Sequence, residues 1–228
     1  MGKWLLFFVL FSVLHVVGQV QVDSINEDSR YFEDQFYLGV TYNIVRNRPD
    51  GVAQQNLSYG LQVGFIKDLP LNGRGTRALG IGLGLGLNTY YSNLLAAEGQ
   101  NGISYSLGDS TTGFKRSKLE THSVEFPLEF RWRNSTLEEY KFWRLYAGIK
   151  AAYLFGARST AIIDGARTGF NNTDVERFQY GLMLNVGYNT FNIHVYHALN
   201  DLFSEGVTVN NQIIGFSPLR IGVIFYIL

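Results

Sequence analysis

Hydrophobic and polar side chains alternate along residues 124–155, on both sides of a polar interruption at 133–142. The apolar positions of the first half are Val124, Phe126, Leu128, Phe130 and Trp132. The apolar positions of the second half are Trp143, Leu145, Ala147, Ile149, Ala151, Tyr153 and Phe155. A period of two indicates β-strands, because successive side chains of a strand point to opposite faces. The pattern therefore predicts two strands joined by a turn, with one apolar face and one face that carries charges of both signs.

The same alternation predicts six further strands, at residues 36–44, 57–65, 78–92, 178–188, 191–196 and 219–228. The third of these is the most regular, because leucine or isoleucine alternates with Gly80, Gly82, Gly84 and Gly86. A dinucleotide-binding fingerprint needs glycines at the unequal spacing G-x-G-x-x-G before a helix, so this repeat does not predict one. Glycines on one face instead leave room for large side chains from other strands of a narrow barrel.

Strands of roughly 10 residues with an apolar outer face and a polar inner face are the units of outer-membrane barrels. We therefore predict an all-β fold, an eight-stranded antiparallel up-and-down transmembrane β-barrel spanning residues 35–228. The connections at 92–118, 156–174 and 200–217 are long and polar, whereas those at 133–142 and 189–190 are shorter. The first two connections, 46–55 and 67–77, show no such difference. Long extracellular loops and short periplasmic turns predict that both termini are periplasmic.

The N-terminus predicts export. Lys3 precedes an apolar run at 4–17 that is short for a membrane-spanning helix, so residues 1–18 are expected to be a signal peptide rather than an anchor. The acidic residues 19–34 are expected to form a periplasmic lead-in. Together with the strand pattern, this places the mature chain in the outer membrane of a Gram-negative bacterium.

Composition narrows the chemistry. The formal net charge is zero, which removes the electrostatic case for nucleic acid, and the absence of cysteine excludes disulfides and thiolate metal sites. His194 and His197 point to opposite faces of one predicted strand, which disfavours a shared metal ion. No serine lies beside His197 to act as a nucleophile in a lipid hydrolase. No cofactor is expected.

The inward charges are the main candidate site, a lumen charge network made of Glu125, Glu129, Arg131, Arg144 and Lys150. Two carboxylates can serve glycoside hydrolysis, but here neighbouring cations favour their ionised form. An eight-stranded barrel is just wide enough for side chains to fill, so we predict that this network closes the interior. Pro127 cannot donate to a strand ladder, which predicts a bulge there. Trp132 and Trp143 flank the turn as interfacial anchors would.

The last strand carries an assembly signal. Arg220, Gly222, Phe225 and Ile227 resemble the C-terminal pattern that barrel-assembly machinery recognises, although Leu228 stands where phenylalanine is commoner. We therefore expect this machinery and outer-membrane lipid to be partners of the chain.

The sequence Glu125-Phe126-Pro127-Leu128, together with Leu199-Asn200 after the seventh strand, resembles the PorT-like outer-membrane β-barrel family of Bacteroidota over residues 36–228. The resemblance implies a barrel and, for one subgroup, a role in type IX protein secretion. Three functions stay open: a non-enzymatic component or anchor of an envelope assembly, a small passive porin, and a membrane-embedded lipid-modifying enzyme. The first would bind another envelope protein through residues 19–34 or through the loops 93–117 and 157–174, whose aromatic side chains are Tyr105, Phe114 and Phe170.

Overall fold

The computed structural model describes residues 34–100, 102–109, 111, 113–134 and 143–227, and the secondary structure of this part is almost entirely β. Within it, no helix has the length and apolar character needed to cross a membrane. The predicted signal peptide (1–18) and the predicted periplasmic segment, apart from Asp34, lie outside the described residues.

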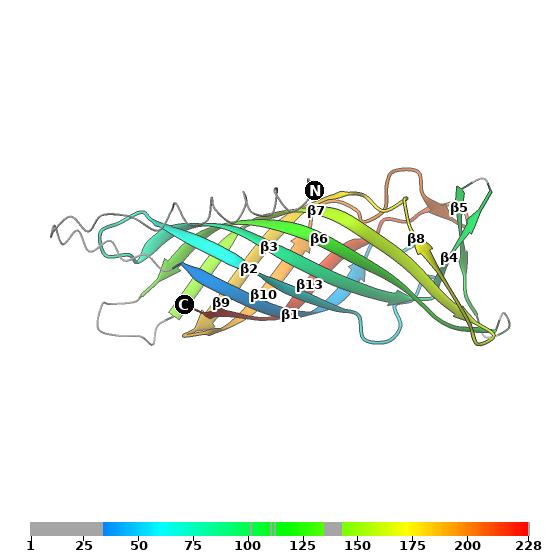
Figure 1. The fold of residues 1–228 in the computed structure, drawn as a ribbon, viewed down its shortest axis with the longest axis horizontal. Helices are drawn as coiled ribbons and strands as arrows, with labels where there is room; N and C mark the ends of the chain where they lie inside the picture. Colours follow the sequence, from blue (N-terminus) through cyan, green and yellow to red (C-terminus); the bar gives the residue numbers. More distant parts are fainter. Residues whose placement is uncertain (1–33, 101, 110, 112, 135–142, 228) are drawn as a thin grey trace, which may run out of the picture.

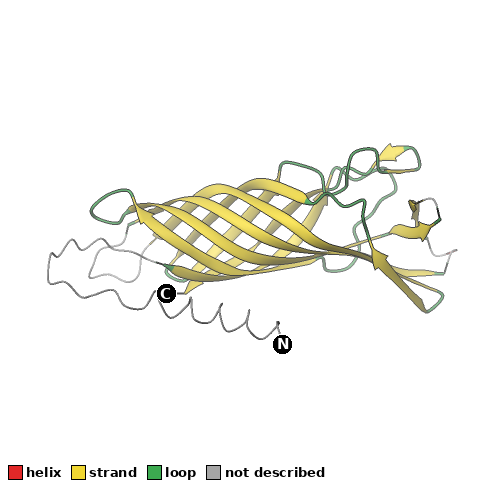
Figure 2. Ribbon diagram, turned by 45° about the horizontal axis from the view of Figure 1, so that its top comes forward, coloured by secondary structure: helices red, strands yellow, loops and turns green. Residues whose placement is uncertain are grey.

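Eight long strands form a closed barrel (Figures 1 and 2). They are β1 (Gln35–Arg46), β2 (Tyr59–Pro70), β3 (Arg77–Ser92), β6 (Phe114–Arg133), β7 (Trp143–Ile163), β9 (Phe178–Tyr188), β10 (Phe191–Ala198) and β13 (Ser217–Ile227). Each pairs antiparallel with the next long strand along the chain, and β1 pairs with β13 to close the ring. The predicted eight-stranded antiparallel barrel is confirmed. Closure matters because it leaves no unpaired sheet edge in the wall.

The two ends of the barrel differ. We call the end where β1 begins and β13 ends the terminal end, and the opposite end the loop end. Short strands lie within the loop-end connections: β4 (Leu94–Gly99), β5 (Gly102–Leu107), β8 (Ala166–Asn171), β11 (Thr208–Val209) and β12 (Gln212–Ile213). The prediction that 92–118 and 156–174 are loops throughout is wrong, because β6 and β7 continue beyond the barrel and β8 pairs with β7.

The alternation of long and short connections extends to the first pair, contrary to the sequence-based expectation. Strand β2 continues to Pro70, so the terminal-end connection shrinks to residues 71–76, against 47–58 at the loop end. The polar residues Lys67 and Asp68 resemble a loop in sequence, but they keep the period of two. Lys67 is exposed and Asp68 is fully buried, because the interior holds cations that pair with a carboxylate.

The wall has the predicted polarity. Strand β9 alternates between exposed and buried along its whole length, and the exposed positions are apolar. Leu83 on β3 is 56% exposed, like many other large apolar side chains around the ring. A continuous apolar surface of this kind marks contact with lipid or partners rather than with water. The closed ladder satisfies the backbone polar groups that lipid could not.

The glycines of β3 make room for interior side chains, as predicted. A Cβ atom on Gly80 would come within 2.7 Å of the Arg131 Nε, and one on Gly86 within 2.5 Å of the Glu125 Oε1. A Cβ atom on Gly84 would collide with the Tyr37 hydroxyl. The small residues of one strand therefore accept the large residues of others.

The predicted bulge at Pro127 is wrong. Pro127 stays paired with Lys150, and the register between β3 and β6 is the same on both sides of it, although the Gly82–Pro127 and Leu83–Phe126 pairs drop out of that ladder. Gly82 explains the fit, because a Cβ there would lie 2.7 Å from the proline ring. The β6–β7 ladder shifts register elsewhere, between Phe114 and Arg116 and between His122 and Ser123, and the second shift leaves Phe155 as the extra residue of β7.

Candidate functional site

Two groups of charged side chains fill the barrel interior. The first, the central cluster, joins Glu125 of β6, Lys150 of β7 and Arg220 of β13. The Lys150 Nζ lies 2.8 Å from one Glu125 oxygen, and the Arg220 Nη1 lies 3.5 Å from the other. Lys150 also donates to the Gln62 amide oxygen at 2.8 Å. Both cations lie over the Tyr196 ring, 5.0 Å and 4.8 Å from its centre. All three charges are buried, so each depends on the others for its stability.

The second group, the terminal cluster, lies nearer the terminal end. Asp68 bonds Arg131 with one oxygen and accepts from Arg133 at 2.7 Å with the other. The Arg131 Nε donates to Glu129 at 2.8 Å. The Arg131 guanidinium also lies 4.5 Å from the centre of the Tyr146 ring. The combination of ion pairs and cation–π contact is the arrangement that compensates a buried guanidinium for its lost water.

Neutral polar groups complete the terminal cluster. The Asn185 amide donates to Glu129 at 3.2 Å and to the Tyr226 hydroxyl at 3.0 Å. Tyr226 donates to Glu129 at 3.3 Å. The His194 Nδ1 lies 2.5 Å from the Asn185 Oδ1, so this histidine belongs to the interior hydrogen-bond network. In the described part of the chain, no group of three or more His, Cys, Asp or Glu side chains is placed to hold a metal ion.

The structure divides four of the five residues proposed from sequence as a lumen network between the two clusters. Glu125 and Lys150 lie in the central cluster, and Glu129 and Arg131 lie in the terminal cluster, while Arg144 is buried at the terminal end of β7. The sequence-based set missed partners of these charges, among them Gln62, Asp68, Arg133, Asn185, Arg220 and Tyr226. Extending the inward parity of β2 by a few residues would have found Asp68.

The other residues singled out in the sequence lie on the wall. Trp132 and Trp143 are 41% and 56% exposed near the terminal end, and Trp143 packs against Tyr188 with ring centres 5.6 Å apart. On β13, Ile227 points outward, whereas Arg220 is buried in the central cluster. The anchoring role of the tryptophans and the recognition of this strand by assembly machinery remain predictions.

A folded cap covers the loop end. Apolar side chains from the loop-end connections pack on inward-facing wall residues in one cluster. Its members are Val45, Val52, Tyr90, Leu94, Leu119, Ala152, Leu154, Val175, Leu202, Phe203, Val209, Ile214 and Phe216. Burial of this kind is the main stabilising term of a folded core, so these connections form a structured unit.

Tyr105 of β5 ties the cap together. Its hydroxyl bonds Asn172 and Asp174, both at 3.1 Å, and its ring meets Phe203 edge-on at 5.5 Å. Burial raises the pKa of this phenol, so it stays protonated and able to donate. Tyr105 therefore serves contacts between loops, which corrects its interpretation as an aromatic side chain available to a partner.

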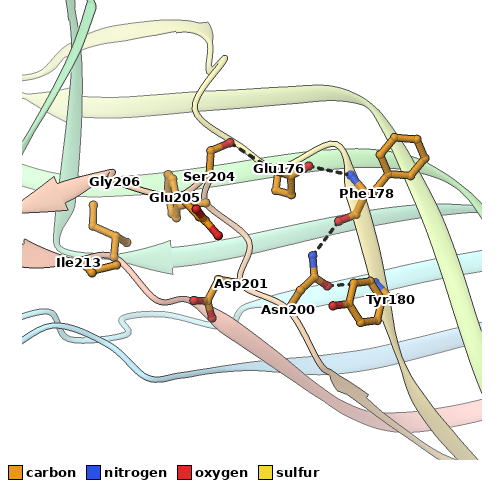
Figure 3. A pocket seen from close by; sticks show the side chains of 11 residues that line it. Glu176, Phe178, Tyr180, Asn200, Asp201, Ser204, Glu205, Gly206 and Ile213 are labelled. Atoms are coloured by element: carbon orange, nitrogen blue, oxygen red, sulfur yellow. Dashed lines mark hydrogen bonds between the residues drawn. The ribbon is translucent and has the colours of Figure 1, made fainter.

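A groove of about 680 Å³ opens on the outer rim, between β9 and the connection that precedes β13 (Figure 3). Phe178, Tyr180 and Ile213 line it together with three carboxylates. Asn200 fixes its floor by donating to the Phe178 carbonyl at 2.7 Å and accepting from the Tyr180 amide at 3.0 Å. Glu176 is likewise engaged by the Phe178 amide at 3.4 Å. These polar groups hold the loop against the wall.

A closed antiparallel barrel with an apolar outer face, a charged interior and long connections at one end defines an outer-membrane β-barrel protein. The sequence matches the model of the family described as outer membrane protein beta-barrel domain over residues 19–204. The chain belongs to this family, and its location is the outer membrane.

Solved structures add little. The chain is similar to engineered variants of a porin from Rhodopseudomonas blastica and to a structure titled "Asymmetric conductivity of engineered proteins". Each is 10% identical, with 86% of this chain and 100% of the other chain covered, at a TM-score of 0.16. A similarity of that size carries no argument about function. No curated protein matches the sequence.

Proposed function

We propose that the protein is a non-enzymatic outer-membrane barrel that acts as a component or anchor of an envelope assembly. The observation that carries this proposal is the filled interior. The central and terminal clusters occupy the lumen with paired, buried charges, and the cap covers the loop end. Because paired side chains fill the barrel interior, the surfaces available for function are the outer wall, the outside of the cap and the periplasmic segment.

The porin alternative requires an open lumen, and the ion pairs argue against one. Large side chains such as Arg131 and Tyr146 are fully buried at the height of the terminal cluster. Purified protein in planar bilayers is therefore expected to show little or no steady conductance. Large and stable single-channel currents would reverse the order of the two functions.

The described interior carboxylates do not favour the enzyme alternative. Glu125 and Glu129, the two interior carboxylates first considered, are both engaged in ion pairs at 2.8 Å. General acid–base work needs a carboxyl group that can reach a substrate proton. Neither buried group meets that condition in a filled lumen.

The finer proposal is membership of the PorT-like group, with a role in type IX secretion. It rests on the resemblance at Glu125-Phe126-Pro127-Leu128 and on the start of the last loop-end connection at Leu199-Asn200. In this proposal both termini are periplasmic, and residues 19–34 or the outside of the cap contact the partner. Phe114 and Phe170 are only partly buried there and remain available for such a contact.

Cross-linking in native outer membranes, followed by mass spectrometry, tests the proposal. We expect one envelope protein to be recovered with the barrel, and deletion of 19–34 or of the β4–β5 hairpin identifies the segment that holds it. The hairpin deletion is checked by heat-modifiable migration, so that a misfolded barrel is not mistaken for a lost contact. Recovery of the barrel alone, with secretion and envelope integrity unchanged by both deletions, would exclude an assembly role.

A further inference from the structure

Strands β6, β7 and β8 form a three-stranded sheet that projects past the barrel at the loop end (Figures 1 and 2). Its register aligns three rows across the strands. One row is Arg116, Ile162 and Arg167; the next is Lys118, Thr160 and Gly169; the row nearest the barrel is Glu120, Arg158 and Asn171. On β6 and β7 these positions share the parity of the outer wall, because the alternate residues Ser117, Leu119, Ser159 and Ala161 are buried.

This outward surface is strongly basic. It carries four cations, Arg116, Lys118, Arg158 and Arg167, and one carboxylate, Glu120, which lies 2.6 Å from the Lys118 Nζ. Arg116, Arg158 and Arg167 are exposed and, among the described residues, form no ion pair. We call these four cations the basic face. Neighbouring strands are about 4.8 Å apart, so each cation has another within reach of a single multiply charged group.

Contacts within the protein hold two of these arginine side chains in place. The Arg158 guanidinium donates to the Gly169 carbonyl at 3.1 Å, and a Cβ on Gly169 would lie 3.2 Å from it. The Arg116 guanidinium lies 5.8 Å from the centre of the Tyr91 ring on β3. Arginine in a fixed orientation suits phosphate, because its planar fork can donate two parallel hydrogen bonds.

Apolar side chains lie directly below the basic face on the same wall. Phe155 and Phe178 are 62% and 65% exposed, and Phe178 packs against Tyr153 with ring centres 5.2 Å apart. A cleft of about 140 Å³ lies between these aromatic side chains and the basic face. Its lining includes Phe155, Asn171 and Arg177. Arg158 is three residues beyond Phe155, roughly 10 Å along the strand. Cations at that height lie where the head groups of a bilayer lie.

We propose that this surface binds a phosphorylated lipid, with acyl chains against the aromatic side chains of the wall and phosphate groups on the basic face. Both parts of the site are needed. The aromatic side chains contact the acyl chains, and the cations of the basic face bind the phosphate groups. A soluble anion would contact only the basic face, and an uncharged lipid would contact only the aromatic side chains. The inference concerns the membrane around the barrel and does not depend on the proposed assembly role.

The test uses the full-length protein in nanodiscs of phosphatidylcholine that contain diphosphorylated lipid A as the probe. Lipid retained after detergent extraction is counted by native mass spectrometry. The variant Arg158→Gln with Arg167→Gln removes two cations of the basic face while preserving side-chain length. The control, Arg46→Gln with Arg48→Gln, removes two exposed cations from the same end at β1, on the opposite side of the ring. Heat-modifiable migration verifies that both variants fold.

The unmodified protein is expected to retain lipid A selectively at low salt. A cation near an anionic lipid surface contributes a factor of about five in binding, so the Arg158–Arg167 variant should lose roughly 20-fold and the control little. Replacing both arginines with lysine should preserve most of the binding, and added salt should weaken it. Equal retention by the variant and the unmodified protein overturns the proposal, as does an equal loss in the control. Full displacement by inorganic phosphate would also overturn it, because the lipid body would then contribute nothing.

Discussion

Removing the Glu125 carboxylate should destabilise the barrel more than removing either of its two cations. Among the described residues, Glu125 is the one carboxylate that pairs with both Lys150 and Arg220. The change Glu125→Gln preserves size but leaves two buried positive charges next to the same Tyr196 ring. The change Lys150→Met also preserves size, and it leaves Glu125 with Arg220 at 3.5 Å. Both substitutions therefore preserve side-chain volume, but the first leaves two unpaired cations and the second leaves one ion pair.

The two distances rank the attractions that each change removes. With an effective dielectric constant of 20, attraction is about 6 kcal/mol at 2.8 Å and about 5 kcal/mol at 3.5 Å. Glu125→Gln removes both attractions but also removes the desolvation cost of the carboxylate, so the net cost should be the roughly 3–5 kcal/mol typical of leaving a buried charge without its partner. Lys150→Met removes one attraction together with the desolvation of the lysine itself. Its cost should fall below about 3 kcal/mol, and the double variant should be less destabilised than the two single costs added together.

Equilibrium unfolding in guanidinium chloride, with the protein in lipid vesicles and tryptophan fluorescence as the signal, measures these differences. Trp132 and Trp143 lie on the outer wall, far enough from the central cluster to report unfolding rather than the local change. The reasoning is refuted if Glu125→Gln costs no more than Lys150→Met. It is also refuted if the two single changes are simply additive, because an additive result means that the ion pair does not couple the residues.

Three further outcomes are expected. Leu83→Arg should cost roughly 2–4 kcal/mol because the side chain faces lipid, and an unchanged unfolding midpoint would contradict the assignment of faces. Gly84→Leu should prevent folding or lower stability sharply, because even a Cβ collides with the Tyr37 hydroxyl; normal heat-modifiable migration would contradict this. Tyr105→Phe removes hydrogen bonds to Asn172 and Asp174, so limited proteolysis should cut the cap faster while the barrel stays intact, and unchanged cleavage would show that the cap does not need them.

The terminal-end half of the barrel was largely predictable from the sequence. Alternation of apolar and polar residues predicts strands, faces and strand number, because each depends only on neighbours along one chain. Strand β9 was predicted with its observed bounds, 178–188. The role of the β3 glycines was predictable for a similar reason: a residue without a side chain on an inward face leaves space for one from elsewhere.

Tertiary structure decided which charges meet and what the long connections do. Asp68 and Arg131 are 63 positions apart in sequence, and they meet because β2 and β6 both pair with β3, whose Gly80 leaves room between them. The cap was not predictable from periodicity, because its apolar residues come from four connections and form a core only when the ring places the connections side by side. The bulge predicted at Pro127 is absent for the same reason. Pro127 by itself predicts a bulge, but Gly82 on the facing strand leaves room for the proline ring. Local patterns determine which face a side chain takes, whereas contacts across the ring determine its partner.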